Sequence, residues 1–252
     1  LPDGSRHVLN SDGVVELHAP DAGSIPAEIE HSLVDRKSWE EQYVHRYQWS
    51  EKRVNEALVK ISSEQFLRWD KGGVDFLRED KRDFPLGFFC GSLYGHFRNV
   101  VGVVGSSYMQ IDDSGLYGEI LHTIAELCYR NLEYALQQGV KFDFVHFWED
   151  ICFKNGPLVA PGVFAEYCGP SYRRIADLAN RHGINILSVD CDGLIDELIP
   201  VWLENGINTM FPIEVGTWNA SIAPWRKQYG REIRGVGGMN KVVFAQDRDA
   251  ID

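Results

Sequence analysis

The stretch that decides the fold runs from residue 184 to residue 214 and reads INILSVDCDGLIDELIPVWLENGINTMFPIE. It opens with an apolar run that ends in the polar residues Asp190 and Asp192. A short helical segment over 196–204 follows, and a second apolar run ends in Glu214. Parallel strands read as near-continuous apolar runs, and the helix between two of them returns the chain to start the next strand. The stretch therefore predicts a strand–helix–strand unit.

The same rhythm continues on both sides of this unit. Long helices are expected over 117–138 and 161–181, where apolar residues recur at helical spacing and a glycine follows. The apolar runs predict strands that lie parallel and adjacent in sequence order, near residues 86–90, 142–148, 184–190, 207–213 and 232–236. The fold class is therefore α/β.

Polar residues at the strand ends favour a closed barrel over an open sheet. An open doubly wound sheet gathers its functional groups at one switch point. Here nearly every run ends in its own polar or glycine cluster, as the strands of a (β/α)8 TIM barrel do at their C-terminal face. We therefore expect a (β/α)8 TIM barrel. Only five clear strands and a weak one at 14–18 are found, so the barrel is expected to be incomplete at one or both termini or to hide further strands in its first section.

The chain, residues 1–252, is expected to form a single domain of this type. Spaced apolar residues between Ser38 and Asp80 fit two or three amphipathic helices on the outside of a core. The section 1–83 is therefore expected to be mainly helical, and the strand and helix units of the barrel to occupy 84–252.

Charge and cysteine usage exclude several classes of partner. The 25 Lys and Arg residues against 37 Asp and Glu residues give a net charge of −12, which repels phosphate backbones and anionic lipid. No apolar run approaches the roughly 18 residues of a membrane span. We therefore expect neither nucleic acid nor membrane as a partner. The five cysteines are scattered without a Cys-x-x-Cys pair, which indicates a reducing, cytoplasmic location.

Four carboxylates at the predicted strand ends are the candidate catalytic residues. Asp190 and Asp192 lie two apart, so an extended backbone directs both side chains to one side, and Glu149 and Glu214 end two other strands. Around one mouth the four would repel one another and raise at least one pKa, producing a proton donor or a metal site. We expect them to converge on one pocket, with Ser92 and Asn240 on its rim. Helix capping remains an alternative role for Asp192. For Asp150 a helix cap and a functional role are both open.

Other residues have weaker claims to chemistry. His146 lies inside an apolar run, where a core role is expected, whereas His96 follows a glycine-containing loop and is a candidate for lining a pocket. Cys191 lies between two aspartates, which favours a buried, unreactive thiol.

Several segments together carry a resemblance to a known family. In order along the chain they are GSL (91–93), FWED (147–150), KNGPL (154–158), VDCDG (189–193), IPVWLENG (199–206), FPIE (211–214) and GGMNK (237–241). The part of the chain that contains them resembles the uroporphyrinogen decarboxylase-like superfamily. This superfamily comprises the decarboxylase itself and corrinoid-dependent methyltransferases, and the resemblance implies a (β/α)8 barrel.

The methyltransferase branch implies a donor, a partner and a departure at the metal site. Its members pass a methyl group from methylcobalamin, held by a corrinoid protein, to a thiol or to tetrahydrofolate. In the thiol-methylating members a His and a Cys at a strand end hold zinc. Asp190 stands at the His position and Asp192 at the Cys position here, so a zinc site that activates a thiolate is not expected, and any metal is left open.

Three functions follow from this resemblance. The first is methyl transfer from a methylated corrinoid on a partner protein to a small acceptor, a folate or a thiol. In it Asp192, Asp190, Glu149 and Glu214 are catalytic, and the residues that bind substrate are Ser92, Tyr94, His96, Trp148, Trp218 and Asn240. The second is cofactor-free decarboxylation of a tetrapyrrole with Asp192 as the central acid, and the third is a truncated or degenerate barrel without activity. A homodimer is left open as an assembly.

Overall fold

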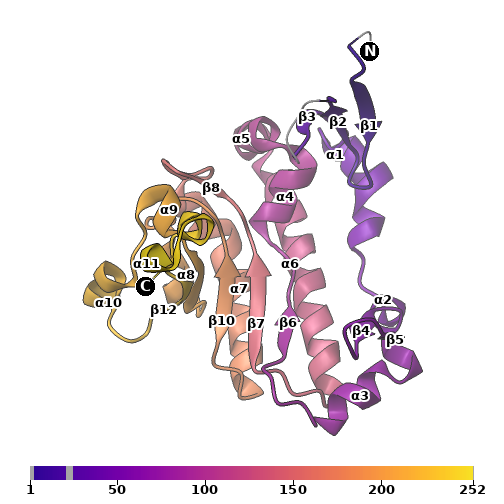
Figure 1. The fold of residues 1–252 in the computed structure, drawn as a ribbon. Helices are drawn as coiled ribbons and strands as arrows, with labels where there is room; N and C mark the ends of the chain where they lie inside the picture. The colour runs from indigo at the N-terminus through magenta and orange to yellow at the C-terminus, as the bar shows by residue number, and fades with distance from the viewer. Residues whose placement is uncertain (1–2, 21–24, 252) are drawn as a thin grey trace.

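The computed structural model describes residues 3–20 and 25–251, and a five-stranded parallel sheet forms its centre. Figure 1 shows the sheet with its helices behind it. Across the sheet the strands are β12 (Arg234–Gly237), β11 (Thr209–Ile213), β10 (Leu187–Asp190), β7 (Phe144–Trp148) and β6 (Gly87–Phe89). Every neighbouring pair is parallel. The predicted α/β class and the predicted order of five adjacent parallel strands are confirmed.

Helices cover one face of this sheet. They are α4 (Tyr94–Val101), α5 (Val103–Asp112), α6 (Ser114–Gln137), α7 (Pro161–Arg181) and α8 (Ile199–Glu204). Side chains alternate along β7, so Val145 and Phe147 are buried in the core with α6 and α7, whereas His146 and Trp148 face the other side. We call the side that carries His146 and Trp148 the inner face of the sheet.

The inner face is open in the described part of the chain. A hollow of about 520 Å³ lies on it, lined by Phe89, His146, Phe211 and their neighbours. Phe89 is 64% exposed and Val236 47% exposed. Within residues 3–20 and 25–251 the sheet has five strands, so a complete (β/α)8 barrel is not formed there. The apolar runs predicted strands covered on both faces, but helices cover only one face.

The N-terminal section contains strands as well as short helices. Its elements are β1 (Arg6–Leu9), β2 (Val14–His18), β3 (Ala27–His31), α1 (Arg36–Ser38), α2 (Glu51–Asn55), β4 (Leu58–Lys60), β5 (Phe66–Arg68) and α3 (Gly73–Glu79). The weak strand predicted at 14–18 is β2, but it pairs antiparallel with β1 and β3 outside the central sheet. Strands and helical segments thus share this section, and the strands, of three to five residues, are too short to show their period in the sequence.

Polar contacts with Glu119 on α6 fasten this section to the central helices. The indole Nε1 of Trp39, a fully buried residue, donates to Glu119 Oε1 on α6 over 2.9 Å, and Arg36 pairs with the other oxygen of that carboxylate. Trp39, Tyr43 and Tyr47 pack into the same core as the sheet. The section is therefore an integral part of the core.

The remaining elements lie beyond the carboxyl ends of the strands and at the C-terminus. They are β8 (Cys152–Phe153), β9 (Gly156–Pro157), α9 (Val215–Trp218), α10 (Ile222–Tyr229) and α11 (Arg248–Ile251). None of the helices in the described residues combines the length and the apolar character that a membrane crossing requires.

Candidate functional site

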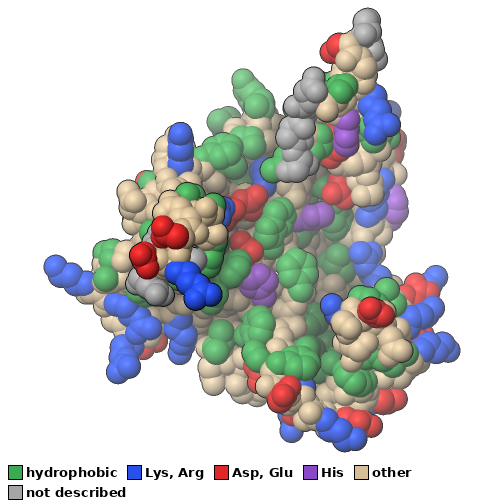
Figure 2. All heavy atoms as spheres, viewed as in Figure 1, with side chains coloured by type: hydrophobic (Ala, Val, Ile, Leu, Met, Phe, Trp, Pro, Cys, Tyr) green, Lys and Arg blue, Asp and Glu red, His purple; other side chains and the backbone are tan. Residues whose placement is uncertain are grey.

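Three of the four predicted carboxylates meet at the carboxyl ends of the strands. Asp190 ends β10, Asp192 follows two residues later, and Glu214 directly follows β11. Each of these charges acts on its neighbour, and Asp150, two residues beyond β7, acts on both aspartates. In Figure 2 acidic side chains lie near the middle of the inner face, above hydrophobic and histidine side chains. We call Asp150, Asp190, Asp192 and Glu214 the carboxylate cluster.

Burial and mutual repulsion set the protonation of this cluster. Burial, and then the charges of Asp192 and Asp150, raise the pKa of Asp190 to about 6. The pKa of Asp192 is also raised, by burial and by the charges of Glu214 and Asp150, while Lys241 opposes the shift. Asp190 can therefore gain or lose a proton near neutral pH, as a general acid or base must.

Contacts of Glu214 and Gly193 fix the loop that follows Asp192. Glu214 Oε2 accepts a hydrogen bond from Gly193 N over 2.8 Å, and Glu214 Oε1 accepts one from Thr217 over 2.5 Å. Gly193 has φ +91°, and a Cβ there would lie 2.6 Å from the carbonyl oxygen of Cys152. Asp192 caps no helix, since α8 begins only at Ile199. The alternative of a helix cap at Asp192 is therefore excluded.

Glu149 lies apart from the cluster. Its carboxylate is fully buried between β7, α4 and α7, where it accepts hydrogen bonds from Leu93 N at 2.8 Å, Gly95 N at 2.6 Å, Ser92 Oγ at 3.3 Å and the Tyr172 hydroxyl. Burial raises its pKa, and these four donors oppose the shift. The expectation that Glu149 joins the other carboxylates in one pocket was wrong. Trp148 faces the inner side, so the next residue faces the helices.

The residues around α4 divide between core and pocket. Tyr94 is buried among Phe97, Tyr117 and Phe164, so its predicted place on a pocket wall is not observed. His96 lies on α4 and not in a loop, as the sequence had suggested. Its Nε2 is 2.9 Å from the Tyr47 hydroxyl, and burial lowers its pKa.

A second pocket joins three of the predicted substrate-binding residues. It has a volume of about 360 Å³ and is lined by Ser92, His96, Trp148 and side chains of α6. Trp148 is paired in register with Asp190, so both side chains lie next to each other on the inner face. The pocket therefore borders the carboxylate cluster across the width of one strand. Ser92 lies beside Glu149 and not on the rim of the cluster.

The other predicted residues have mixed positions. Trp218 on α9 packs against Trp225, with ring centroids 6.1 Å apart, and is partly buried against the core. Asn240 accepts from Val242 N and so begins the turn that carries Lys241, near the cluster. His146 is not a core residue, because it lies on the inner face with its Nδ1 2.8 Å from Ser188 Oγ.

Cys191 is buried, as predicted, but for a different reason. A hydrogen bond with Cys152, together with burial, raises the pKa of its thiol well above the usual range. From the sequence, the charges of the two neighbouring aspartates were expected to raise this pKa, whereas Cys152 and burial are its largest causes. The thiol is therefore protonated at neutral pH and unsuited to nucleophilic attack.

Two basic residues near the cluster were not anticipated. Arg98 on α4 donates to the Asp150 carbonyl oxygen at 2.9 Å and lies 3.8 Å from its carboxylate, and Lys241 acts on Asp192. Asp150 itself has a positive φ of 47°, which an aspartate tolerates better than most residues. Asp150 follows the end of β7 by two residues, just as Asp192 follows the end of β10. This shared spacing is the sequence feature from which the position of Asp150 in the cluster could have been predicted.

The described residues contain no group of three or more His, Cys, Asp or Glu side chains placed to hold a metal ion.

Replacing Asp190 with asparagine should stabilise the protein in a pH-dependent way. The raised pKa means that ionising Asp190 is less favourable in the folded state than in the unfolded state. The resulting loss of folding free energy is absent below about pH 4 and complete above about pH 6. Because the side chain is partly solvated, we expect Asp190→Asn to raise the free energy of unfolding by about 1–2 kcal/mol at pH 8 and to leave it unchanged at pH 3.8. Urea denaturation at both pH values measures this.

The matched control is Asp177→Asn, on an exposed position of α7. Its effect should stay within about 0.5 kcal/mol at both pH values. A loss of stability at pH 8 in Asp190→Asn would contradict the assignment of an unfavourable charge at that position.

Comparison with solved structures gives a likeness in fold. No family model matches the sequence, and no curated protein is similar to it. Among solved structures, a methyltransferase from Methanosarcina mazei is similar, with a TM-score of 0.53 and 11% sequence identity. The match covers 93% of this chain and 59% of that one, so this chain spans less than two thirds of the length of that structure. At this identity the likeness concerns the fold.

Proposed function

We propose that this chain is a methyltransferase that moves a methyl group from a methylated corrinoid, carried by a partner protein, to a small acceptor such as a folate or a thiol. The observation that carries the proposal is the carboxylate cluster at the strand ends, in which the pKa of Asp190 is about 6. The likeness in fold to the Methanosarcina mazei methyltransferase supports the same class of reaction.

The cluster would serve the acceptor. A neutral N–H or S–H acceptor that gains a methyl group loses one proton, and the corrinoid keeps the electron pair of the broken cobalt–carbon bond. Asp190 is placed to take up that proton near neutral pH, and Asp192 to orient the acceptor or to stabilise the charge that develops on it. Glu214 would hold the loop that carries Asp192, through its bond to Gly193.

The hollow on the inner face suits the methyl donor. Methylcobalamin is here a co-substrate with a large, planar and mostly apolar ring. Phe89, Phe211 and Val236 line the hollow beside the cluster and would provide apolar contacts for such a ring. Trp148, in register with Asp190, lines the second pocket, where the acceptor would bind, and would pack beside the acceptor so that its nucleophilic atom faces the methyl group.

We further propose that the sheet belongs to a (β/α)8 barrel. Three features support this: all pairs are parallel, helices cover one face only, and the functional groups gather at the carboxyl ends of the strands. Further strands would then pair with the edges of β6 and β12, which are free within the described residues, and would leave the carboxyl ends of the strands, with Phe89, Phe211 and Val236, open to the methyl donor.

Spectroscopy separates the candidate reactions. Purified protein is incubated with free methylcobalamin and either tetrahydrofolate or a small thiol, and the corrinoid absorbance is followed. We expect a protein-dependent loss of the methylcobalamin spectrum with one of the acceptors. A parallel incubation with uroporphyrinogen tests decarboxylation, which the negative cluster disfavours because that substrate carries eight carboxylates. Turnover of uroporphyrinogen alone would replace the proposal by decarboxylation, and turnover of neither would favour a barrel without activity.

A further inference from the structure

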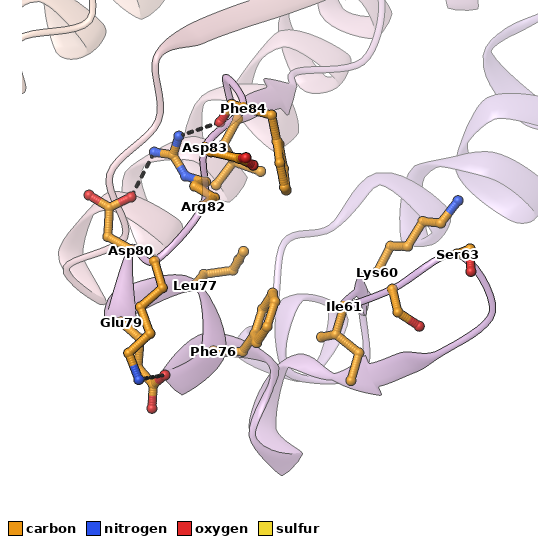
Figure 3. A pocket seen from close by; sticks show the side chains of 13 residues that line it. Lys60, Ile61, Ser63, Phe76, Leu77, Glu79, Asp80, Arg82, Asp83 and Phe84 are labelled. Carbon is orange, nitrogen blue, oxygen red and sulfur yellow. Dashed lines mark hydrogen bonds and ion pairs between the residues drawn. The ribbon is translucent and has the colours of Figure 1, made fainter.

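A third hollow lies at the opposite end of the sheet from the carboxylate cluster. It has a volume of about 610 Å³ and is bounded by the β4–β5 hairpin, by α3 and by the segment 80–86 that leads into the amino end of β6 (Figure 3). Small-molecule sites in proteins have volumes of roughly 300–1,000 Å³. The hollow is therefore large enough for a small organic ligand, and its position excludes a direct part in the proposed reaction.

The walls of this hollow are apolar and partly uncovered. Phe76 on α3 is 43% exposed, and Phe84 is 58% exposed. Figure 3 shows both rings bordering the hollow, with Leu77 between them and Ile61 beside Phe76. Ile61 and Leu77 also pack against the small core that holds Trp69. Two aromatic rings left in contact with water around a concave surface indicate a ligand with an apolar body.

The charges around the hollow are paired, with two exceptions. Arg82 pairs with Asp80 at 3.1 Å and with Asp143 at 2.6 Å, and Lys81 pairs with Glu79 at 2.9 Å. Among the residues that the structure describes, Lys60 and Asp83 form no ion pair. Lys60 belongs to the hairpin and Asp83 to the facing segment (Figure 3). Lys60 is thus the one cation of this lining, within the described residues, that is available to a ligand.

We propose that this hollow binds a small organic acid with an apolar body, whose carboxylate lies at Lys60 and whose body packs between Phe76 and Phe84. Asp83 repels the same anion from the facing side, which sets the orientation of the ligand. The inference is independent of the proposed function, because it concerns the amino end of β6.

Calorimetric titration with octanoate, and with octan-1-ol as the neutral analogue, tests the proposal. We expect octanoate to bind with a 1:1 stoichiometry and more tightly than the alcohol. Lys60→Gln should weaken octanoate binding about fivefold and leave octanol binding unchanged, because a solvent-exposed ion pair contributes up to about that factor. Asp83→Asn should bind octanoate at least as tightly as the parent protein.

Substitutions of the two phenylalanines, each compared with a control substitution outside the hollow, test the contribution of the apolar walls. Phe76→Ser and Phe84→Ser should each weaken binding of both probes about tenfold or more, because each removes an aromatic contact surface. Phe153→Ser is the control, since Phe153 on β8 is 59% exposed and does not line the hollow. Thermal unfolding of each variant confirms that the fold is kept, which is expected because all three phenylalanines are partly exposed.

Several results would overturn the proposal. These are an absence of octanoate binding at millimolar concentration, an equal loss in Phe153→Ser, or no effect of Lys60→Gln on the preference for the anion. Sedimentation velocity, which measures the oligomeric state, tests whether a second copy of the chain occupies the hollow instead of a small ligand. A dimer that Phe84→Ser dissociates, in a protein that does not bind octanoate, would assign the hollow to a second copy of the chain.

Discussion

Replacing Asp192 with asparagine is expected to lower methyl-transfer turnover by about two to four orders of magnitude, while the fold is kept. Losing a positioned acid, base or charge-stabilising group has costs of this size. Stability should be unchanged or slightly higher, since burial and the charges of Glu214 and Asp150 already disfavour the ionised form of Asp192. Initial rates with methylcobalamin and the responding acceptor, together with urea denaturation, measure both quantities.

The control is the adjacent substitution Cys191→Ser. The Cys191 thiol is buried, and its pKa is raised well above the usual range, so turnover should stay within a few-fold of the parent. An active Asp192→Asn variant beside an inactive Cys191→Ser variant would reverse the assignment and indicate thiolate chemistry at this strand end.

Replacing Glu149 with alanine is expected to have the largest effect on stability. The carboxylate is fully buried, and its removal would leave Leu93 N, Gly95 N and the Tyr172 hydroxyl without their acceptor. Removing one partner of a buried, charged hydrogen-bond network costs about 3–5 kcal/mol. A larger residue at position 95 could not fill the space that the carboxylate leaves, because a Cβ there would collide with the carbonyl oxygen of residue 149. Urea denaturation at pH 7 measures the loss.

Glu166→Ala provides the comparison for this variant. Glu166 is an exposed residue on α7, six residues before Tyr172, and its replacement should change stability by no more than about 0.5 kcal/mol. A Glu149→Ala variant that unfolds at the same urea concentration as the parent would show that the buried carboxylate does not hold α4 and α7 against β7.

The central sheet was predictable from the sequence, and the N-terminal section was not. Strands such as β10 and β11 lie with one side in the core and are read from continuous apolar runs. The hairpin of β4 and β5 has three residues in each strand, so Val59 is its only buried strand residue and no period can emerge. Its strands are stabilised by contacts with α3 and Trp69, which local sequence does not encode.

The candidate site was predictable to the extent that strand ends determine it. Asp190, Asp192 and Glu214 were expected together because parallel strands end at one edge of the sheet, and they lie together there. Glu149 lies one position after Trp148, so its side chain points to the opposite face of the sheet. Trp148 shares its register with Asp190, so Glu149 faces the helices, as the alternation of side chains along β7 requires. The contribution of Lys241 depends on a turn begun by Asn240, which only the folded chain places near the cluster.

The open inner face has a practical consequence for the colloidal behaviour of the protein. Within residues 3–20 and 25–251, the outer edges of β6 and β12 are unpaired, and with exposed Phe89 and Val236 they form a template on which another extended chain can add. What opposes this attachment is long-range repulsion from a net charge of −12. That repulsion vanishes near the isoelectric point of about 5.1 and is screened by salt. Purification in mildly alkaline buffer of low ionic strength therefore keeps molecules apart, whereas acidification brings uncovered sheets into contact.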